Sequence, residues 1–387
     1  MHQLAQADRN IRLYPIIKSL AKRVFLPLTA IYFMETANIT LLEIGFMSAF
    51  FSIVQFIAEI PTGYFADVVG RVTSLRTGAY LAALATTIYV FFHHKTGIYI
   101  GVLLEALAYS FMGGAGEALI HDSLVIKNQT DKYTSILTKS MSISLIANAI
   151  LVSVVPMTYQ IDKRLPFFIG TLIYLLLAFT TYFFKDLGTK NKFDPKIPQL
   201  SAIPGKRYIV LFAFSFGIIS ALYTSPADTV NIALKSLGAN PAHIGWIYGI
   251  ASIVGFGLGH LIHKIQNLSL GKYLVVDVVI MSLVFITLTL QSIPLIALAM
   301  IIGISFWRYR RITYQNYALN VYGNSYKATL VSSLNSMEQL SSIWLPIVIT
   351  SLVSYLGLQY GFAAILLLTL LIAPVFYYST LKFFKIL

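Results

Sequence analysis

The chain has 387 residues, of which 57% are hydrophobic and only 11% are charged. A soluble domain carries about 25% charged residues, so burial in one soluble core does not account for this composition. The formal net charge is +13, and the absence of cysteine excludes disulfides, thiol catalysis and cysteine-based metal sites.

Apolar runs of about 20 residues recur along the chain, and few of them alternate with a period of two. This pattern favours membrane-spanning helices, whose backbone polar groups are all bonded within the helix. Residues 1–22 are mixed and polar and show no cleavable signal, so we expect the first apolar run to direct insertion. We predict twelve spans, at residues 20–38, 44–66, 73–92, 97–122, 133–157, 165–184, 207–234, 243–263, 270–290, 294–319, 327–354 and 359–381.

One long polar connection divides the predicted spans into two groups of six. It predicts a first six-helix half at residues 1–184, a cytoplasmic linker at 185–205 and a second half at 206–387. With the N-terminus inside, 21 of the 28 Lys and Arg residues, Arg23 among them, fall in inner segments and four in outer segments. This bias predicts that both termini are cytoplasmic, and it explains the basic charge better than a nucleic-acid surface does.

Two segments 200 residues apart resemble each other. Residues 44–56 read IGFMSAFFSIVQF and residues 244–256 read IGWIYGIASIVGF, with six of thirteen positions identical and no gap. The offset relates the second predicted span to the eighth, which run in the same direction. A parallel repeat of two six-helix halves is typical of transporters that rock about a central site, although chance similarity between apolar segments is the alternative.

The segment that follows the second apolar run has the most specific pattern. Residues 59–71 read EIPTGYFADVVGR, in which Gly63 is expected to permit close helix approach and Gly70 a tight turn. Asp67 lies at the predicted cytoplasmic end, near Arg71. Its carboxylate is expected either to cap a helix N-terminus or to pair with a cation of the other half.

These residues resemble the signature loop of the major facilitator superfamily, and in particular its bacterial branch with the EIPTG–AD–GR form. The sequence EALIHDSL at 117–124 and the sequence KATLVS at 327–332 match further patterns of that branch. The resemblance implies the fold of that superfamily and an inner gate in which Asp67 contacts the start of the eleventh span near Lys327. A turn that only sets topology is the alternative.

Two departures from the family pattern concern coupling. At the 200-residue offset, Asn267 stands for Asp67 and His263 for Gly63, so the second half lacks the loop motif. The fifth span has no glycine, whereas the drug–proton antiporters of the family carry a Gly-Pro-Gly type of signature there. This absence weakens the interpretation as a proton-driven drug exporter.

Polar residues on single helix faces predict a water-filled substrate cavity, since such stripes are costly against lipid. The predicted cavity residues are Gln55, Tyr109, Arg308, Arg311, Gln315, Asn335 and Gln339. Arg308 and Arg311 form either a cationic wall for an anionic group of the substrate or, with Arg310, basic residues that snorkel to the inner headgroups. Arg310 is expected to point away from the other two arginines.

Three acidic residues are candidates for proton coupling. Glu105 is the deepest of them in the fourth span, and Glu117 lies toward the inner end of that span. Glu338, near the middle of the eleventh span, is expected to be either a structural partner of Arg308 or a proton carrier. Glu35 and Asp228 lie toward outer helix ends, where they belong either to an outer gate or to solvated ends.

Taken together, the sequence predicts a secondary active transporter in a bacterial inner membrane, working on a small solute by alternating access. Proton coupling and an anionic substrate are expected but left open. The rivals are an efflux pump for hydrophobic compounds and a non-transporting sensor or assembly partner with the same fold. No P-loop, metal pattern or cluster of catalytic groups occurs, so we expect neither an enzyme nor a cofactor. The resemblance implies a monomer.

Overall fold

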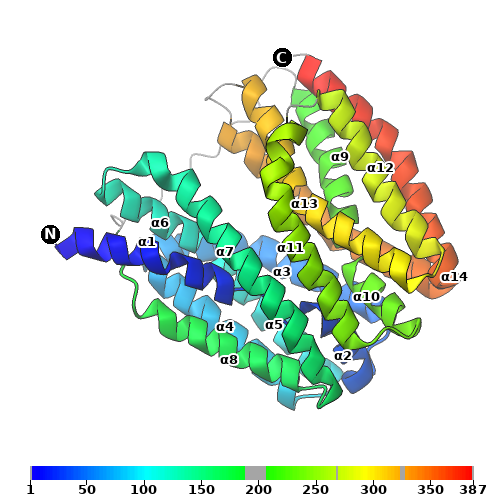
Figure 1. Ribbon diagram of the computed structural model, residues 1–387, viewed down its shortest axis with the longest axis horizontal. Helices are drawn as coiled ribbons and strands as arrows, with labels where there is room; N and C mark the ends of the chain where they lie inside the picture. Colours follow the sequence, from blue (N-terminus) through cyan, green and yellow to red (C-terminus); the bar gives the residue numbers. More distant parts are fainter. Residues whose placement is uncertain (1, 188–205, 267–268, 323–326, 386–387) are drawn as a thin grey trace. The chain divides into compact units, whose positions relative to one another are not determined.

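The computed structural model describes residues 2–187, 206–266, 269–322 and 327–385, in which all regular structure is helical and no strand occurs (Figure 1). The α-helices are α1 His2–Leu20, α2 Thr29–Ala37, α3 Leu41–Val68, α4 Arg71–Phe91, α5 Lys95–Met112, α6 Ala115–Ile126, α7 Tyr133–Val154, α8 Leu165–Thr181, α9 Lys206–Thr224, α10 Ala227–Ser236, α11 Pro241–Gln266, α12 Leu270–Thr289, α13 Ile293–Tyr322 and α14 Lys327–Lys385. Short 3-10 helices follow α1 and flank α7: η1 Leu26–Leu28, η2 Thr130–Lys132 and η3 Val155–Gln160. The expected all-helical class is confirmed.

Many helices expose apolar faces that water would not tolerate. Among the described residues, seven helical segments are long and apolar enough to cross a membrane, and two shorter apolar helices accompany them. Large apolar side chains point outward along them, for example Ile60, which is 74% exposed, and Leu371, which is 65% exposed. Acyl chains are the medium that suits such faces.

The chain divides into two compact units. The first contains residues 1–39 and 53–195, and the second contains residues 40–52 and 196–387. The start of α3 therefore belongs with the second unit, a feature that the apolar pattern does not show. The division at residues 184 and 205 stays a prediction.

The internal repeat extends to the helix boundaries. Its two segments lie in α3 and α11, which begin at Leu41 and Pro241, so the 200-residue offset holds for the helix starts as well as for the matched letters. The following pairs begin at Arg71 and Leu270 and at Lys95 and Ile293, with nearly the same offset. Conserved spacing over three helices supports a duplicated architecture more strongly than letter identity in one apolar stretch.

The N-terminal segment is a helix and not the polar lead-in that we expected. The buried residues Ala7, Asn10, Tyr14 and Ile17 recur at helical spacing and form one packed face of α1, which contacts α6, α7 and α8 (Figure 1). The remaining positions are polar, and this mixture hides the packed face from a hydropathy count. Helical structure therefore begins at His2, well before the predicted span of 20–38.

Three of the long segments are interrupted. The chain leaves helical geometry after Leu20 and resumes through η1 and α2; it turns at Gly114, with φ of 70°, between α5 and α6; and it breaks at Ser225 and Pro226 between α9 and α10. Proline and glycine account for the last two breaks. Interrupted helices are tolerated at membrane depth only where protein or a water-filled cavity meets the freed backbone groups.

Candidate functional site

A buried carboxylate lies at the centre of the first unit. Glu105 on α5 is 1% exposed, and its Oε1 lies 2.8 Å from Nε of Arg23, while Nη2 of Arg23 donates to Oε2 at 3.1 Å. The hydroxyl of Tyr89 on α4 also donates to Oε2, at 2.9 Å. The guanidinium thus pairs with a carboxylate that would otherwise be costly to bury, and Oε2 receives both hydrogen bonds.

Two further tyrosines extend this cluster. Tyr109 lies one helical turn after Glu105 on α5, and its hydroxyl is 2.7 Å from that of Tyr174 on α8. Gly101 lies one turn before Glu105, and a side chain there would overlap the Tyr89 ring, so glycine is what lets α4 and α5 approach at this level. We name the set of Arg23, Tyr89, Glu105, Tyr109 and Tyr174 the Glu105 centre.

The two charges of the Glu105 centre differ in access. Arg23 keeps 24% of its side chain exposed, against 1% for Glu105. Arg23 also lies in the interruption between α1 and η1, where its carbonyl accepts the Leu26 amide at 3.1 Å. Arg23 is therefore the more exposed member of this pair, and Glu105 is the enclosed one.

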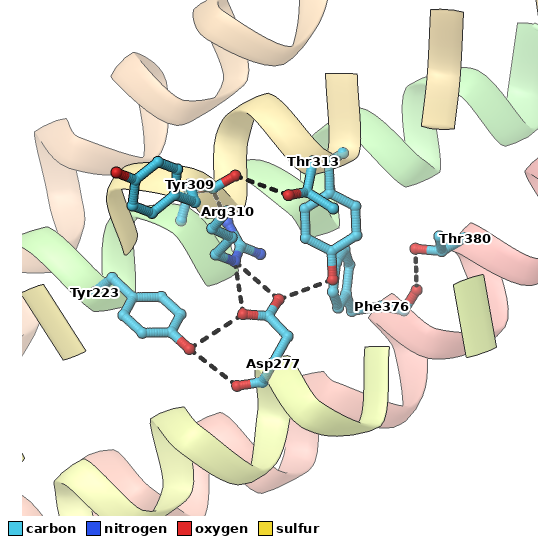
Figure 2. A network of polar contacts seen from close by, with 9 residues as sticks. Tyr223, Asp277, Tyr309, Arg310, Thr313, Phe376 and Thr380 are labelled. Atoms are coloured by element: carbon cyan, nitrogen blue, oxygen red, sulfur yellow. Dashed lines mark hydrogen bonds and ion pairs between the residues drawn. The ribbon is translucent and has the colours of Figure 1, made fainter. Parts of the chain in front are cut away.

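The second unit holds its own buried ion pair (Figure 2). Nε of Arg310 on α13 donates to both carboxylate oxygens of Asp277 on α12, at 2.9 and 2.8 Å. Tyr314 donates to Oδ2 of Asp277 at 2.8 Å, and Tyr223 on α9 donates to Oδ1 at 3.1 Å and to the Asp277 carbonyl at 2.9 Å. Arg310 is 1% exposed and Asp277 is fully buried.

Aromatic rings enclose the Arg310 guanidinium. Its central carbon lies 4.9 Å from the ring centroids of both Phe216 and Tyr314, and 5.7 Å from that of Phe376 on α14. Nη1 donates to the Ser220 hydroxyl, whereas Nη2 is buried with no hydrogen-bond partner among the described residues. We name Ser220, Tyr223, Asp277, Arg310 and Tyr314 the Asp277 centre; it ties α9, α12 and α13 together.

Arg310 and Arg23 both lie in ion pairs with a buried carboxylate. Arg310 does not snorkel to the headgroups, because Asp277 neutralises it inside the unit. Arg23 is not a free inner-surface charge, because it pairs with Glu105 in the fourth apolar segment. Asp277 was missed altogether, although a lone acid within the run KYLVVDVVIMSLV was the signal that could have found it.

The predicted loop motif forms a polar network inside the first unit. Gly70 has φ of 135°, so the tight turn expected there is confirmed. Arg71 pairs with Asp122 at 3.0 Å and more weakly with Asp67, at 3.7 Å. The carboxylate that receives the N-terminus of α4 comes from Asp186, whose Oδ1 accepts the Val72 amide at 2.9 Å. Asp186, and not Asp67, therefore caps α4.

The other gate residues fall outside this network. The close helix approach expected at Gly63 is not found, because a Cβ added there would meet nothing within 4 Å among the described residues. The side chain of Lys327 lies outside the described part of the chain, so its contact with Asp67 stays a prediction.

The predicted cavity residues are only partly described. Tyr109 belongs to the Glu105 centre, Gln55 is half-buried, and Gln339 has a buried Oε1 without a hydrogen-bond partner among the described residues. The side chains of Arg308, Arg311, Gln315 and Asn335 lie outside the described part of the structure. The cationic wall expected from Arg308 and Arg311 therefore stays a prediction.

The three acidic candidates occupy different environments. Glu105 is buried, whereas Glu117 is 48% exposed and pairs with Lys18 at 2.8 Å. Glu338 is half-buried on α14, where Gly217 of α9 comes so close that an added Cβ would lie 2.9 Å from the Glu338 amide nitrogen. Of the two acids on the fourth apolar segment, only Glu105 is buried.

The two outer acids are engaged within their own units. Glu35 pairs with Lys163 at 2.7 Å and accepts the Tyr159 hydroxyl at 2.8 Å, and Asp228 accepts the Ser48 hydroxyl at 3.4 Å. The alternative of simple solvated helix ends does not describe either residue. Among the described residues, no group of three His, Cys, Asp or Glu side chains could hold a metal ion.

Apolar helices with exposed apolar faces and charges paired in their interior define a multi-pass α-helical membrane protein. The chain belongs to the Major Facilitator Superfamily, whose sequence profile matches residues 16–346. The family expected from the loop motif is confirmed, and it is a family of transporters and not of enzymes.

Two curated relatives carry the same assignment. The chain is 24% identical over 264 residues to the MFS-type transporter YxaM of Bacillus subtilis (strain 168), a match that spans 63% of each protein. It is 23% identical over 190 residues to the MFS-type transporter MJ1560 of Methanocaldococcus jannaschii, across 49% of this chain and 47% of the relative. The matches thus span less than two thirds of either relative.

Solved structures resemble the chain over almost its whole length. The nucleoside transporter NupG matches with a TM-score of 0.80 and 13% identity, covering 98% of this chain and 99% of that chain. The POT family transporter PepTSo matches with a TM-score of 0.72 and 13% identity, covering 97% of each. At this identity the likeness shows the fold alone.

Proposed function

We propose that the chain is a secondary active transporter that moves a small solute across a bacterial cytoplasmic membrane by alternating access between two six-helix halves. The observation that carries the proposal is the Glu105 centre: a buried carboxylate behind a partly exposed arginine, at an interruption of the first apolar segment. In transporters, interrupted helices and buried charges mark substrate and ion pathways.

The proposed topology has twelve spans and cytoplasmic termini. The helices group into twelve segments when α1–η1–α2, α5–α6 and α9–α10 are each taken as one and α14 is divided at Gly357, where φ is 78°. An even number of spans keeps most basic residues on the inner side.

The Glu105 centre supports coupling between a proton and an anion. While Glu105 is ionised, it neutralises Arg23. An anionic group of the substrate that binds Arg23 from its exposed side competes with that carboxylate, and two negative charges at one guanidinium favour protonation of Glu105. Proton uptake and anion binding then accompany each other, so net charge inside the membrane stays low.

The inner gate belongs to the same proposal. Asp67 is 43% exposed and only weakly held by Arg71, so its carboxylate is available for Lys327 when the cytoplasmic side closes. Asp122 meanwhile keeps Arg71 occupied, at 3.0 Å.

Thermal stability in detergent against a panel of anionic, zwitterionic, neutral and cationic solutes identifies the substrate class, because a ligand of the folded state raises its stability. We expect anions to stabilise the wild type and Arg23→Gln to abolish that shift. Uptake of the selected anion into proteoliposomes should then respond to an inward proton gradient.

Glu105→Gln should keep anion binding but lose the response of uptake to the proton gradient. Glu117→Gln is the matched control, since it removes an exposed carboxylate of the same segment and should transport like the wild type. Stabilisation by cations or neutral amphiphiles, unchanged in Arg23→Gln, would instead support efflux of hydrophobic compounds. A protein that binds solutes but moves none, in either direction, would support the sensor alternative.

A further inference from the structure

A groove lies between the first helix and the end of the eighth, away from the Glu105 centre. Its volume is about 590 Å³, within the range of small-molecule sites. The lining residues are Arg9, Arg12, Leu13, Ile16, Thr180, Phe183 and Phe184, and we call this the α1–α8 groove. All of them belong to the first unit.

The groove is basic at one end and apolar at the other. Arg9 and Arg12 are both exposed and lie three residues apart, on neighbouring positions of one helix face. Leu13 and Ile16 continue that face, and Ile16 is 44% exposed. From Arg9 to Ile16 the helix rises by about 10 Å, enough for a phosphate group and the first part of an acyl chain.

The basic end keeps its positive charge available. Neither Arg9 nor Arg12 makes an ion pair within the described residues; the Arg9 guanidinium instead lies 5.2 Å from the Phe183 ring centroid. The nearby acid, Asp8, is taken by Lys127, whose hydrogen bond holds the pKa of that carboxyl below its ordinary value. Asp8 is therefore ionised at neutral pH; Lys127 is its hydrogen-bonded partner, and Arg12 is a weaker electrostatic neighbour.

We propose that the α1–α8 groove binds an anionic glycerophospholipid, with the phosphate between Arg9 and Arg12 and an acyl chain against Leu13, Ile16 and Phe183. Guanidinium groups pair well with phosphate oxygens, and basic pockets between membrane helices at the cytoplasmic side suit such headgroups. A free phosphate would use the basic end alone and leave the apolar side exposed. The apolar side of the groove therefore favours a lipid.

The test measures binding in detergent, so it is independent of transport and of the proposed substrate. Purified protein is titrated separately with dioleoylphosphatidylglycerol, dioleoylphosphatidylcholine and inorganic phosphate, and the melting temperature and the lipid adducts seen by native mass spectrometry are recorded. We expect phosphatidylglycerol to stabilise and to form adducts at the lowest concentrations, phosphatidylcholine to bind weakly, and phosphate to have no effect.

Two variants and a control locate the site. Arg9→Gln/Arg12→Gln should weaken phosphatidylglycerol binding by about thirtyfold, since each basic residue near an anionic lipid contributes roughly a factor of five. Ile16→Asn should weaken binding of both lipids, because it places an amide where the acyl chain lies. Lys132→Gln/Lys139→Gln removes the same charge from two exposed positions outside the groove and should bind like the wild type.

Three results would overturn the proposal. Equal loss of binding in the arginine and lysine variants would mean a nonspecific effect of net charge. Equal stabilisation by inorganic phosphate and by phosphatidylglycerol would mean an ion site without a lipid. Equal affinity for both lipids would mean that the headgroup charge is not recognised.

Discussion

Glu105 and Asp277 each share a buried ion pair with an arginine, but the two pairs differ in how the cation is enclosed. Arg310 is 1% exposed and surrounded by aromatic rings, whereas Arg23 is 24% exposed. Removing one partner of a fully buried pair leaves a charge without compensation, which is far more costly than leaving a charge that reaches solvent. The Asp277 centre is therefore built for stability, and the Glu105 centre tolerates rearrangement.

This difference predicts that two isosteric substitutions, each of which removes one carboxylate charge, destabilise the protein to different extents. Asp277→Asn should destabilise by about 3–5 kcal/mol, because Arg310 stays buried with no anion. Glu105→Gln should cost about 1–2 kcal/mol, because the Tyr89 bond can persist to the amide oxygen and Arg23 reaches solvent. The free energy of unfolding of each variant, measured by heat and by denaturant in one detergent, gives the comparison. Similar losses in the two variants would refute the assignment.

A double variant of the Asp277 centre tests whether the lost stability comes from the unpaired charge. Asp277→Leu/Arg310→Leu removes both charges together and should recover a large part of the stability lost in Asp277→Asn, since apolar replacement of a whole buried pair is often close to neutral.

At the residue scale, sequence reasoning found the deep acid and missed its partner. Glu105 was predictable because an ionisable residue inside an apolar run is costly and thus suspect. Arg23 follows a polar N-terminal stretch and so looks like an inner-surface charge, whereas its pairing with Glu105 places it in the interior of the unit. Asp277 and Arg310 lie 33 residues apart, and no local pattern links them.

At the element scale, the turn between α3 and α4 is the most constrained feature of the first unit. Gly70 has φ of 135°, which side chains with a Cβ rarely adopt, and an added Cβ would lie 2.5 Å from Oδ2 of Asp186. That carboxylate cannot withdraw freely, because it receives the Val72 amide. Glycine in the family motif is thus explained by backbone geometry and by a close carboxylate.

Substituting the two glycines of this motif should have opposite effects. Gly70→Ala should destabilise by about 1–3 kcal/mol through strain at the turn. Gly63→Ala should be neutral or stabilise by up to about 1 kcal/mol, because Gly63 is helical and an added Cβ meets none of the described residues within 4 Å. Melting temperatures of both variants in one detergent provide the check. A larger loss in Gly63→Ala would restore the expectation of close helix approach there.

Element boundaries were predictable where an apolar run ends in a charge or a turn residue, and less so where packing overrides composition. The predicted starts at 165 and 270 coincide with those of α8 and α12. The helix α1 was read as a polar segment because only every third or fourth residue packs. The break before η1 has no glycine, so its sequence signal is Pro27 alone.

At the scale of the whole molecule, the internal repeat and the bias of basic residues both constrain the membrane topology. The parallel repeat requires equivalent spans to be an even number of positions apart in the order of spans, here six, and the charge bias requires every second connection to lie inside. Transferring Arg23 from the inner surface to the Glu105 centre lowers the inner count by one and leaves the bias intact. The twelve-span topology can therefore be tested without any knowledge of the substrate.

The sequence contains no cysteine, so a single introduced cysteine is labelled without a background signal from other thiols. This makes the topology test direct. In intact cells, His94→Cys and Leu290→Cys should react with a membrane-impermeant maleimide, since both are exposed in connections placed outside. Asp131→Cys and Ser269→Cys should react only after permeabilisation, since they lie in connections placed inside. Labelling of all four in detergent is the control for reactivity. Reaction of Asp131→Cys and Ser269→Cys from opposite sides would require an odd number of spans between them, and the parallel repeat could not then describe this chain.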